Sequence, residues 1–125
     1  MARRPPRSPH AAAPLPGRRV RGSATGRPVM AALDLLGRRW TLRILWELRA
    51  APLTFRALQA ACGGVSPSVL QQRLAELAEA GLVGHDGGSG YALTPLARRL
   101  MPALLALEGW AAEWAAALGR GRPAP

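Results

Sequence analysis

A helix with clear start and stop signals constrains this chain more than any other feature. Ser66 and Pro67 are favoured residues for the N-cap and the first position of a helix, and Gly81 is a favoured end. Three leucines recur on one face of the segment between them: Leu70, Leu74 and Leu77. We therefore predict a helix over 67–80 that buries its leucines and exposes the opposite side.

Hydrophobic periodicity predicts further short elements on both sides of this helix. Three helices are expected before it, over 28–36, 39–49 and 55–62, and the last of these has Thr54 as its N-cap. After it we expect short strands at 82–83 and 91–93, then a helix from Pro95 to Leu118. Two helices joined by a tight Gly63-Gly64 break and followed by a hairpin predict a mainly α fold, the winged helix-turn-helix.

Composition divides the chain into unequal parts. Residues 1–27 hold seven arginines and five prolines but no acid, so a disordered tail is expected there, with the domain at 28–118 and a flexible end at 119–125. The net charge is +10, and the tail carries most of the excess. A basic tail favours a polyanionic partner such as nucleic acid, and a solubilising leader is the alternative.

Several function classes lack support in the sequence. Cys62 is the single cysteine and His10 and His85 are the only histidines, so we predict no disulfide and no metal site. Glu76 and Glu79 on one helix are interpreted as a solvated face, and no catalytic residue or cofactor is predicted. No apolar run reaches about 18 residues, so neither membrane association nor a location outside the cytoplasm is expected.

Polar side chains opposite the leucines of 67–80 are candidates for contact with double-stranded DNA. Glutamine can bond adenine, arginine can bond guanine or phosphate, and serine can bond either bases or backbone. An ordinary solvated face is the alternative. With flanking arginines, caps and the hairpin turn, the predicted DNA-binding residues are Arg38, Arg39, Thr54, Arg56, Ser66, Pro67, Ser68, Gln71, Gln72, Arg73, His85 and Ser89.

The last helix has apolar residues that alternate spacings of four and three, which predicts a seam for a second copy of the chain. A second apolar stripe beside the seam favours a homodimer over packing within one domain, although that packing is the alternative. The predicted dimerisation residues are Met30, Leu33, Leu100, Leu104, Leu107, Trp110 and Trp114.

Segments 28–41, 65–74, 77–83 and 91–96 together resemble the HxlR-type winged-helix regulators, a branch close to the MarR family. The resemblance implies a dimeric bacterial regulator, acting as repressor or activator, that binds operator DNA. Many members carry a cysteine where this chain has Arg27, and some use it as a sensor, so that chemistry is not expected here. Members usually have a basic residue at Ser68 and a longer wing than 85–90, which predicts weaker docking per subunit.

The sequence leaves alternatives to DNA binding. A winged-helix module that binds proteins is the main alternative, while an enzyme and an RNA binder have less support in the sequence. Trp40, Trp46 and Trp110 are interpreted as core packing, and a cleft that holds a small aromatic or cationic effector is the alternative. Cys62 is interpreted as a structural thiol.

Overall fold

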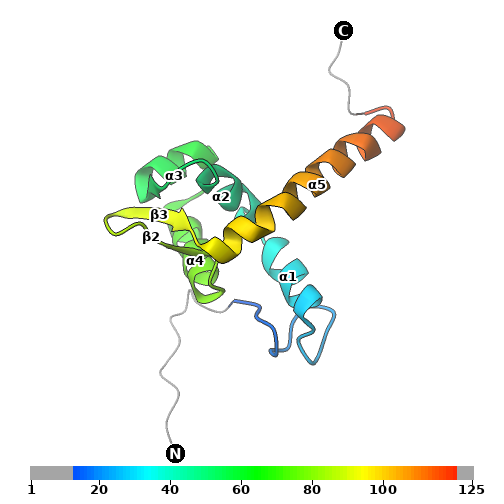
Figure 1. The fold of residues 1–125 in the computed structure, drawn as a ribbon, viewed down its shortest axis with the longest axis horizontal. Helices are drawn as coiled ribbons and strands as arrows, with labels where there is room; N and C mark the ends of the chain where they lie inside the picture. Colours follow the sequence, from blue (N-terminus) through cyan, green and yellow to red (C-terminus); the bar gives the residue numbers. More distant parts are fainter. Residues whose placement is uncertain (1–12, 121–125) are drawn as a thin grey trace, which may run out of the picture.

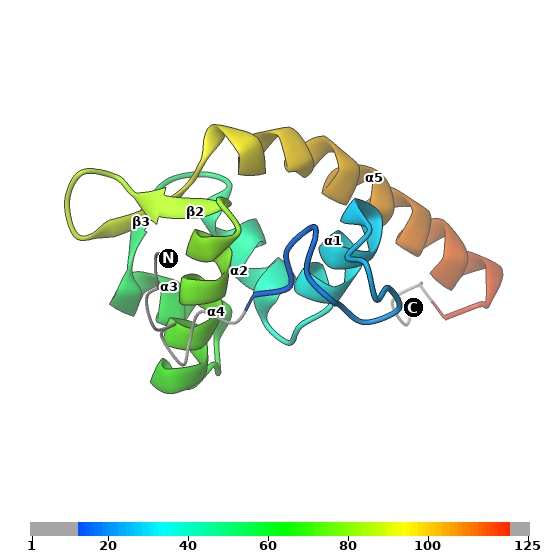
Figure 2. The same cartoon turned by 90° about the horizontal axis from the view of Figure 1, so that it is seen from below.

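The computed structural model describes residues 13–120, which form five helices and a small three-stranded sheet (Figure 1). The helices are α1 (Pro28–Leu36), α2 (Thr41–Leu48), α3 (Phe55–Cys62), α4 (Pro67–Glu79) and α5 (Pro95–Ala117). The strands are β1 (Leu53–Thr54), β2 (Val83–His85) and β3 (Gly90–Leu93). The β2–β3 hairpin projects on one side of the body, and α5 runs away on the other (Figures 1 and 2). The predicted fold class is confirmed.

Local capping explains where three of the helices begin. The side-chain oxygens of Thr54, Ser66 and Thr94 each accept a hydrogen bond from a backbone N–H in the first turn of α3, α4 and α5. The helix expected over 39–49 is shorter than predicted. Its start moves to Thr41 because Trp40 has a left-handed backbone with φ of 76°.

The sheet has the order β1-β3-β2 and is antiparallel throughout. Sequence analysis did not predict β1, which has two residues and pairs Leu53 with Tyr91. The other strands lie one or two positions from where they were expected, and Val83 pairs with Leu93. The hydroxyl of Thr94 donates to the carbonyl oxygen of Gly81 (2.6 Å), which ties the end of the hairpin to the end of α4.

The core lies where α2, α3 and α4 meet the sheet. The predicted leucine stripe of α4 is buried, and it packs with Ile44, Leu45 and Leu48 of α2 and with Leu58 of α3. Burial of each such side chain stabilises the fold by about 1.5–3 kcal/mol. This packing fixes which face of α4 points to solvent.

Residues 13–27, which we call the arm, differ from the expectation of a disordered tail. Ala13 is buried in the core cluster, and its N–H donates to Glu79 Oε1 (2.9 Å). Within the arm, Gly17 N–H donates to the carbonyl oxygen of Gly26 (2.9 Å). The prediction of disorder is therefore wrong for this segment, because composition does not reveal contacts with a distant helix. Residues 1–12 and 121–125 lie outside the described part of the chain.

Candidate nucleic-acid interface

The amino-terminal half of α4 is exposed on the side opposite its leucines. Ser66, Pro67, Ser68 and Gln71 are exposed, and Gln72 is half-buried. The Ser66 oxygen accepts from Val69 N–H (3.2 Å) and lies 3.5 Å from the Ser68 oxygen, so the two hydroxyl groups can also hydrogen-bond to each other. Four polar or capping positions thus share one accessible helix end, where the helix dipole also favours an anion.

A short turn holds this helix end against the preceding helix. Gly63 and Gly64 have φ values of 71° and 150°, a backbone that L side chains rarely adopt. Gln59 Nε2 on α3 donates to the carbonyl oxygen of Val65 (3.3 Å), which braces the turn from outside. The geometry is that of a helix-turn-helix, in which the second helix enters the major groove.

Arg73 does not project outward as the sequence predicted. Its Nη1 donates to Glu76 Oε1 (3.1 Å), and its Nε donates to the carbonyl oxygen of Arg39 (2.8 Å). Arg38 Nη1 donates to the other oxygen, Glu76 Oε2 (2.5 Å). Glu76, whose side chain is only 1% exposed, therefore lies between two guanidinium groups and joins α4 to the α1–α2 turn.

The interpretation of Glu76 and Glu79 as a solvated face is therefore wrong. Glu76 is buried in the ion-pair cluster, and Glu79 binds the arm through Ala13 and Arg18. Helical periodicity places both acids opposite part of the leucine stripe but does not show that other segments cover them. For this reason the sequence did not predict that Glu76 holds α4 against the α1–α2 turn.

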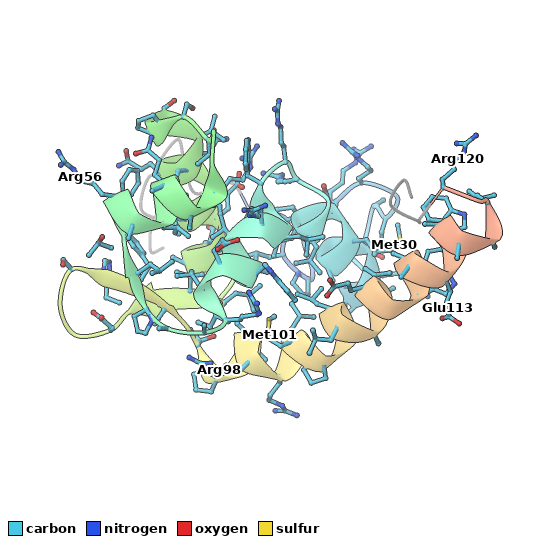
Figure 3. All side chains as sticks on the ribbon, turned by 90° about the horizontal axis from the view of Figure 1, so that it is seen from above. Met30, Arg56, Arg98, Met101, Glu113 and Arg120 are labelled. Carbon is cyan, nitrogen blue, oxygen red and sulfur yellow. The ribbon has the colours of Figure 1, made fainter. Side chains whose placement is uncertain are left out.

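Arginines and a threonine flank the exposed half of α4. Thr54, Arg56 and Arg39 are exposed, and the guanidinium of Arg39 lies 5.6 Å from the Trp40 ring. Figure 3 shows Arg56 projecting from α3, while Arg98 projects from the first turns of α5 at another edge of the molecule. The predicted flanking residues are thus accessible, except Arg38, whose side chain is partly occupied by Glu76.

The wing offers fewer donors than the sequence suggested. His85 and Ser89 are exposed, and the His85 ring lies 4.8 Å from that of Tyr91. Asp86 Oδ1 accepts from the N–H groups of Gly88 (2.9 Å) and Gly90 (3.2 Å). These two backbone amides are therefore not free to bind phosphate, because the aspartate satisfies them.

Comparison with known proteins decides the family to which this fold and site belong. The model of the HxlR-like helix-turn-helix family matches residues 35–118. The chain belongs to this family. An uncharacterized HTH-type transcriptional regulator, YvaP of Bacillus subtilis (strain 168), is 34% identical over 89 residues, which make up 66% of this chain and 82% of that protein.

Solved structures of similar proteins agree with the HxlR-like assignment. A transcriptional regulator of the MarR family from Enterococcus faecalis V583 is 28% identical with a TM-score of 0.67, covering 74% of this chain and 89% of that one. Quinone-bound YodB from B. subtilis is 27% identical with a TM-score of 0.65, covering 68% of this chain and 96% of that one. This HxlR-like chain is a transcriptional regulator of HxlR/MarR type, which implies DNA binding.

The residues expected at a dimer interface fall into two groups in this HxlR-like protein. Leu33, Leu107, Trp110 and Trp114 are exposed, and the two tryptophans stack at 5.6 Å while each remains 55% exposed. The remaining three, Met30, Leu100 and Leu104, are half-buried. The terminal methyl of Met30 lies against Gly22 of the arm, so part of its surface is already covered.

The structure also bears on the tryptophans, on metal binding and on membrane-spanning helices. The core packing expected of three tryptophans is wrong for Trp110, which is 55% exposed and stacks on Trp114. Trp46 lies under the Arg49 guanidinium (3.7 Å) and Trp40 beside Arg39, so the three rings have different neighbours. Between residues 13 and 120, no three Cys, His, Asp or Glu side chains form a metal-binding group. None of the helices in that range is long and apolar enough to cross a membrane.

Cys62 is free and buried at the end of α3. Burial raises the pKa of its thiol, the negative charge of Glu47 raises it further, and Arg43 acts in the opposite direction. Such a thiol is a poor nucleophile at neutral pH, which fits the structural role that the sequence suggested.

Proposed function

We propose that this protein binds operator DNA as a homodimer and represses transcription. The observation that carries the proposal is the exposure of Ser66, Ser68 and Gln71 on the end of α4 that follows the tight turn. The buried leucines on the other face hold this end rigidly, so its polar groups are preorganised for a groove. A helix that reads bases needs one face packed against the domain and a polar face exposed to the DNA.

Gln71 is the side chain best placed to read a base. It is exposed on α4, and its amide can donate to and accept from adenine at the same time. Ser66 and Ser68 lie one turn earlier, where hydroxyl groups reach phosphate or base edges. Arg39 and Arg56 supply phosphate contacts on either side.

Dimerisation is supported by the apolar surface that α5 leaves uncovered. Large side chains face solvent along one side of α5 and at its C-cap: Leu96, Leu107, Trp110, Trp114 and Leu118. A hollow of about 430 Å³ between α2 and α5, lined in part by Leu42 and Trp46, adjoins this side. A second copy would bury these side chains, since exposed apolar surface of this extent marks an interaction site.

Repression is the proposed consequence of this binding mode and needs no added activity. Two copies of α4 held about 34 Å apart would read successive turns of one face of DNA, and a dimer on a promoter blocks access of the polymerase. We therefore place the protein on the chromosome, in the cytoplasm. Footprinting on the DNA flanking the gene tests the proposal, with two protected half-sites as the expected result.

A pair of arginines tests which face meets the DNA. Arg56→Ala should weaken binding to the protected duplex and lower the slope of log K against log salt by about 0.9, the value for one phosphate contact. Arg98→Ala removes an arginine of α5 that is also exposed, and it should leave the slope unchanged. Equal effects of the two changes would contradict the assigned face.

Gln71→Ala tests base reading separately from affinity. Loss of a bidentate contact should cost about 1–3 kcal/mol at one base pair and relax the preference there. Binding to random-sequence duplex should stay the same. If the wild-type protein binds no duplex at any salt concentration, the alternative of a protein-binding winged-helix module gains support.

The dimer has its own test in sedimentation velocity. Trp110→Ala with Trp114→Ala should give a monomer and lower operator affinity, because the stacked rings are the largest exposed apolar groups of α5. Leu105→Ala removes an exposed leucine from the opposite side of the same helix and should remain dimeric. A double variant that stays dimeric would refute the assigned interface.

A further inference from the structure

A polar cleft lies where the arm meets the α1–α2 turn and the outer side of α4. Its volume is about 470 Å³. The residues that line it come from the arm, from α1, from the α1–α2 turn and from α4: Arg21, Met30, Leu33, Asp34, Gly37, Arg38, Arg39, Gln72 and Arg73. The arm lies before residues 35–118, the part of the chain that the family model matches.

The charges in this cleft leave two guanidinium groups available. Arg38 and Arg73 are ion-paired with the buried Glu76. The carboxylate of Asp34 accepts the backbone N–H of Arg21 (3.0 Å). Among the described residues, the side chains of Arg21 and Arg39 have no ion-pair partner, and both are exposed.

We propose that Arg21 and Arg39 together bind one backbone phosphate of DNA, next to the stretch read by α4. This inference rests on the proposed function and adds a contact from outside the helix-turn-helix. Guanidinium groups match the oxygens of a phosphodiester in geometry and charge. Gln72, which lines the same cleft, connects it directly to α4.

The arm is held in a way that preorganises Arg21. Val20 and Ser23 form an antiparallel bridge on either side of Arg21 and Gly22. Arg27 N–H donates to the Ser23 hydroxyl (3.0 Å), and Glu79 anchors the start of the arm through Ala13. A donor fixed before binding loses less conformational entropy when the phosphate arrives, so it contributes more to affinity.

Two variants of the arm test the proposal on the protected duplex. Arg21→Ala should bind about fivefold to tenfold more weakly at low salt and lower the salt slope by about 0.9. Arg19→Ala removes an exposed arginine of the same arm that does not line the cleft, and it should leave the slope unchanged. Both variants should keep the melting temperature of the wild type, because neither side chain packs in the core.

A third variant and a modified duplex localise the contact. Asp34→Asn keeps an acceptor for Arg21 N–H but removes the negative charge from the cleft, so it should tighten binding. A duplex with single methylphosphonate substitutions should show one position whose neutralisation weakens binding of the wild type but not of Arg21→Ala. That non-additivity identifies the phosphate held by Arg21.

The outcomes separate this inference from the proposed function. If wild type binds the duplex but Arg21→Ala equals wild type, or if Arg19→Ala loses as much as Arg21→Ala, the phosphate site is overturned while DNA binding stands. If the wild type binds no duplex at any salt concentration, the proposed function fails and this inference fails with it.

Discussion

Replacement of Glu76 by glutamine should destabilise the fold more than any other single loss of charge in residues 13–120. The carboxylate is 1% exposed and lies between Arg38 (2.5 Å) and Arg73 (3.1 Å). Glutamine keeps one acceptor oxygen, but it removes the charge and turns an NH₂ group toward a guanidinium donor. Two positive groups then face one another without a counter-charge.

The expected size of this effect follows from burial. Removing one partner of a fully buried ion pair costs about 3–5 kcal/mol. The side chains of Arg38 and Arg73 are 30% and 16% exposed, so water compensates part of the loss. We expect about 2 kcal/mol, which lowers the melting temperature of a domain of this size by roughly 8–16 °C.

Urea unfolding followed by far-ultraviolet circular dichroism measures this difference at a fixed protein concentration. Glu47→Gln is the matched control, because Glu47 pairs with Arg43 (2.9 Å) in an i,i+4 ion pair on the surface of α2. That change should cost no more than about 0.5 kcal/mol. If Glu76→Gln costs no more than Glu47→Gln, the buried cluster does not fix α4 to the α1–α2 turn.

Three further predictions concern the cap, the arm and the thiol. Ser66→Ala should lower the free energy of unfolding by about 1 kcal/mol, since its oxygen caps α4, whereas Ser68→Ala should change it little in the same urea titration. Gly26→Ala should make the arm more sensitive to trypsin than Gly17→Ala does. Both glycines have a positive φ (73° and 86°), so alanine strains the backbone at either position, but only at Gly26 does a Cβ collide with the backbone of Arg18. Equal cleavage rates would refute this. Burial raises the pKa of the Cys62 thiol in the folded state, so the unfolded chain loses that proton first and stability should fall as the pH rises above the ordinary thiol range; the fall should be absent in Cys62→Ala.

The elements of this protein were largely predictable from its sequence because their signals are local. Caps such as Ser66 act on N–H groups two or three residues away, and the leucine spacing of α4 follows from the helical repeat alone. The order of the helices and the hairpin needs nothing beyond these signals. β1 was missed because a strand of two residues has no period to detect.

What the sequence left open depends on contacts between residues far apart in the chain. Arg38 and Glu76 are 38 residues apart, and Ala13 and Glu79 are 66 apart, so no periodic pattern connects them. Helical geometry placed Arg73 and Glu76 on α4. Packing against the α1–α2 turn determined that Arg73 hydrogen-bonds to Arg39 and that Glu76 is the buried counter-ion of Arg38 and Arg73. The exposure of Ser66, Ser68 and Gln71 could be predicted from the sequence, because burial of the leucine face leaves the opposite face of α4 in solvent. The ordered arm and the cleft it forms with α4 were decided by tertiary structure, because charge and composition alone do not specify which partner a flexible segment meets.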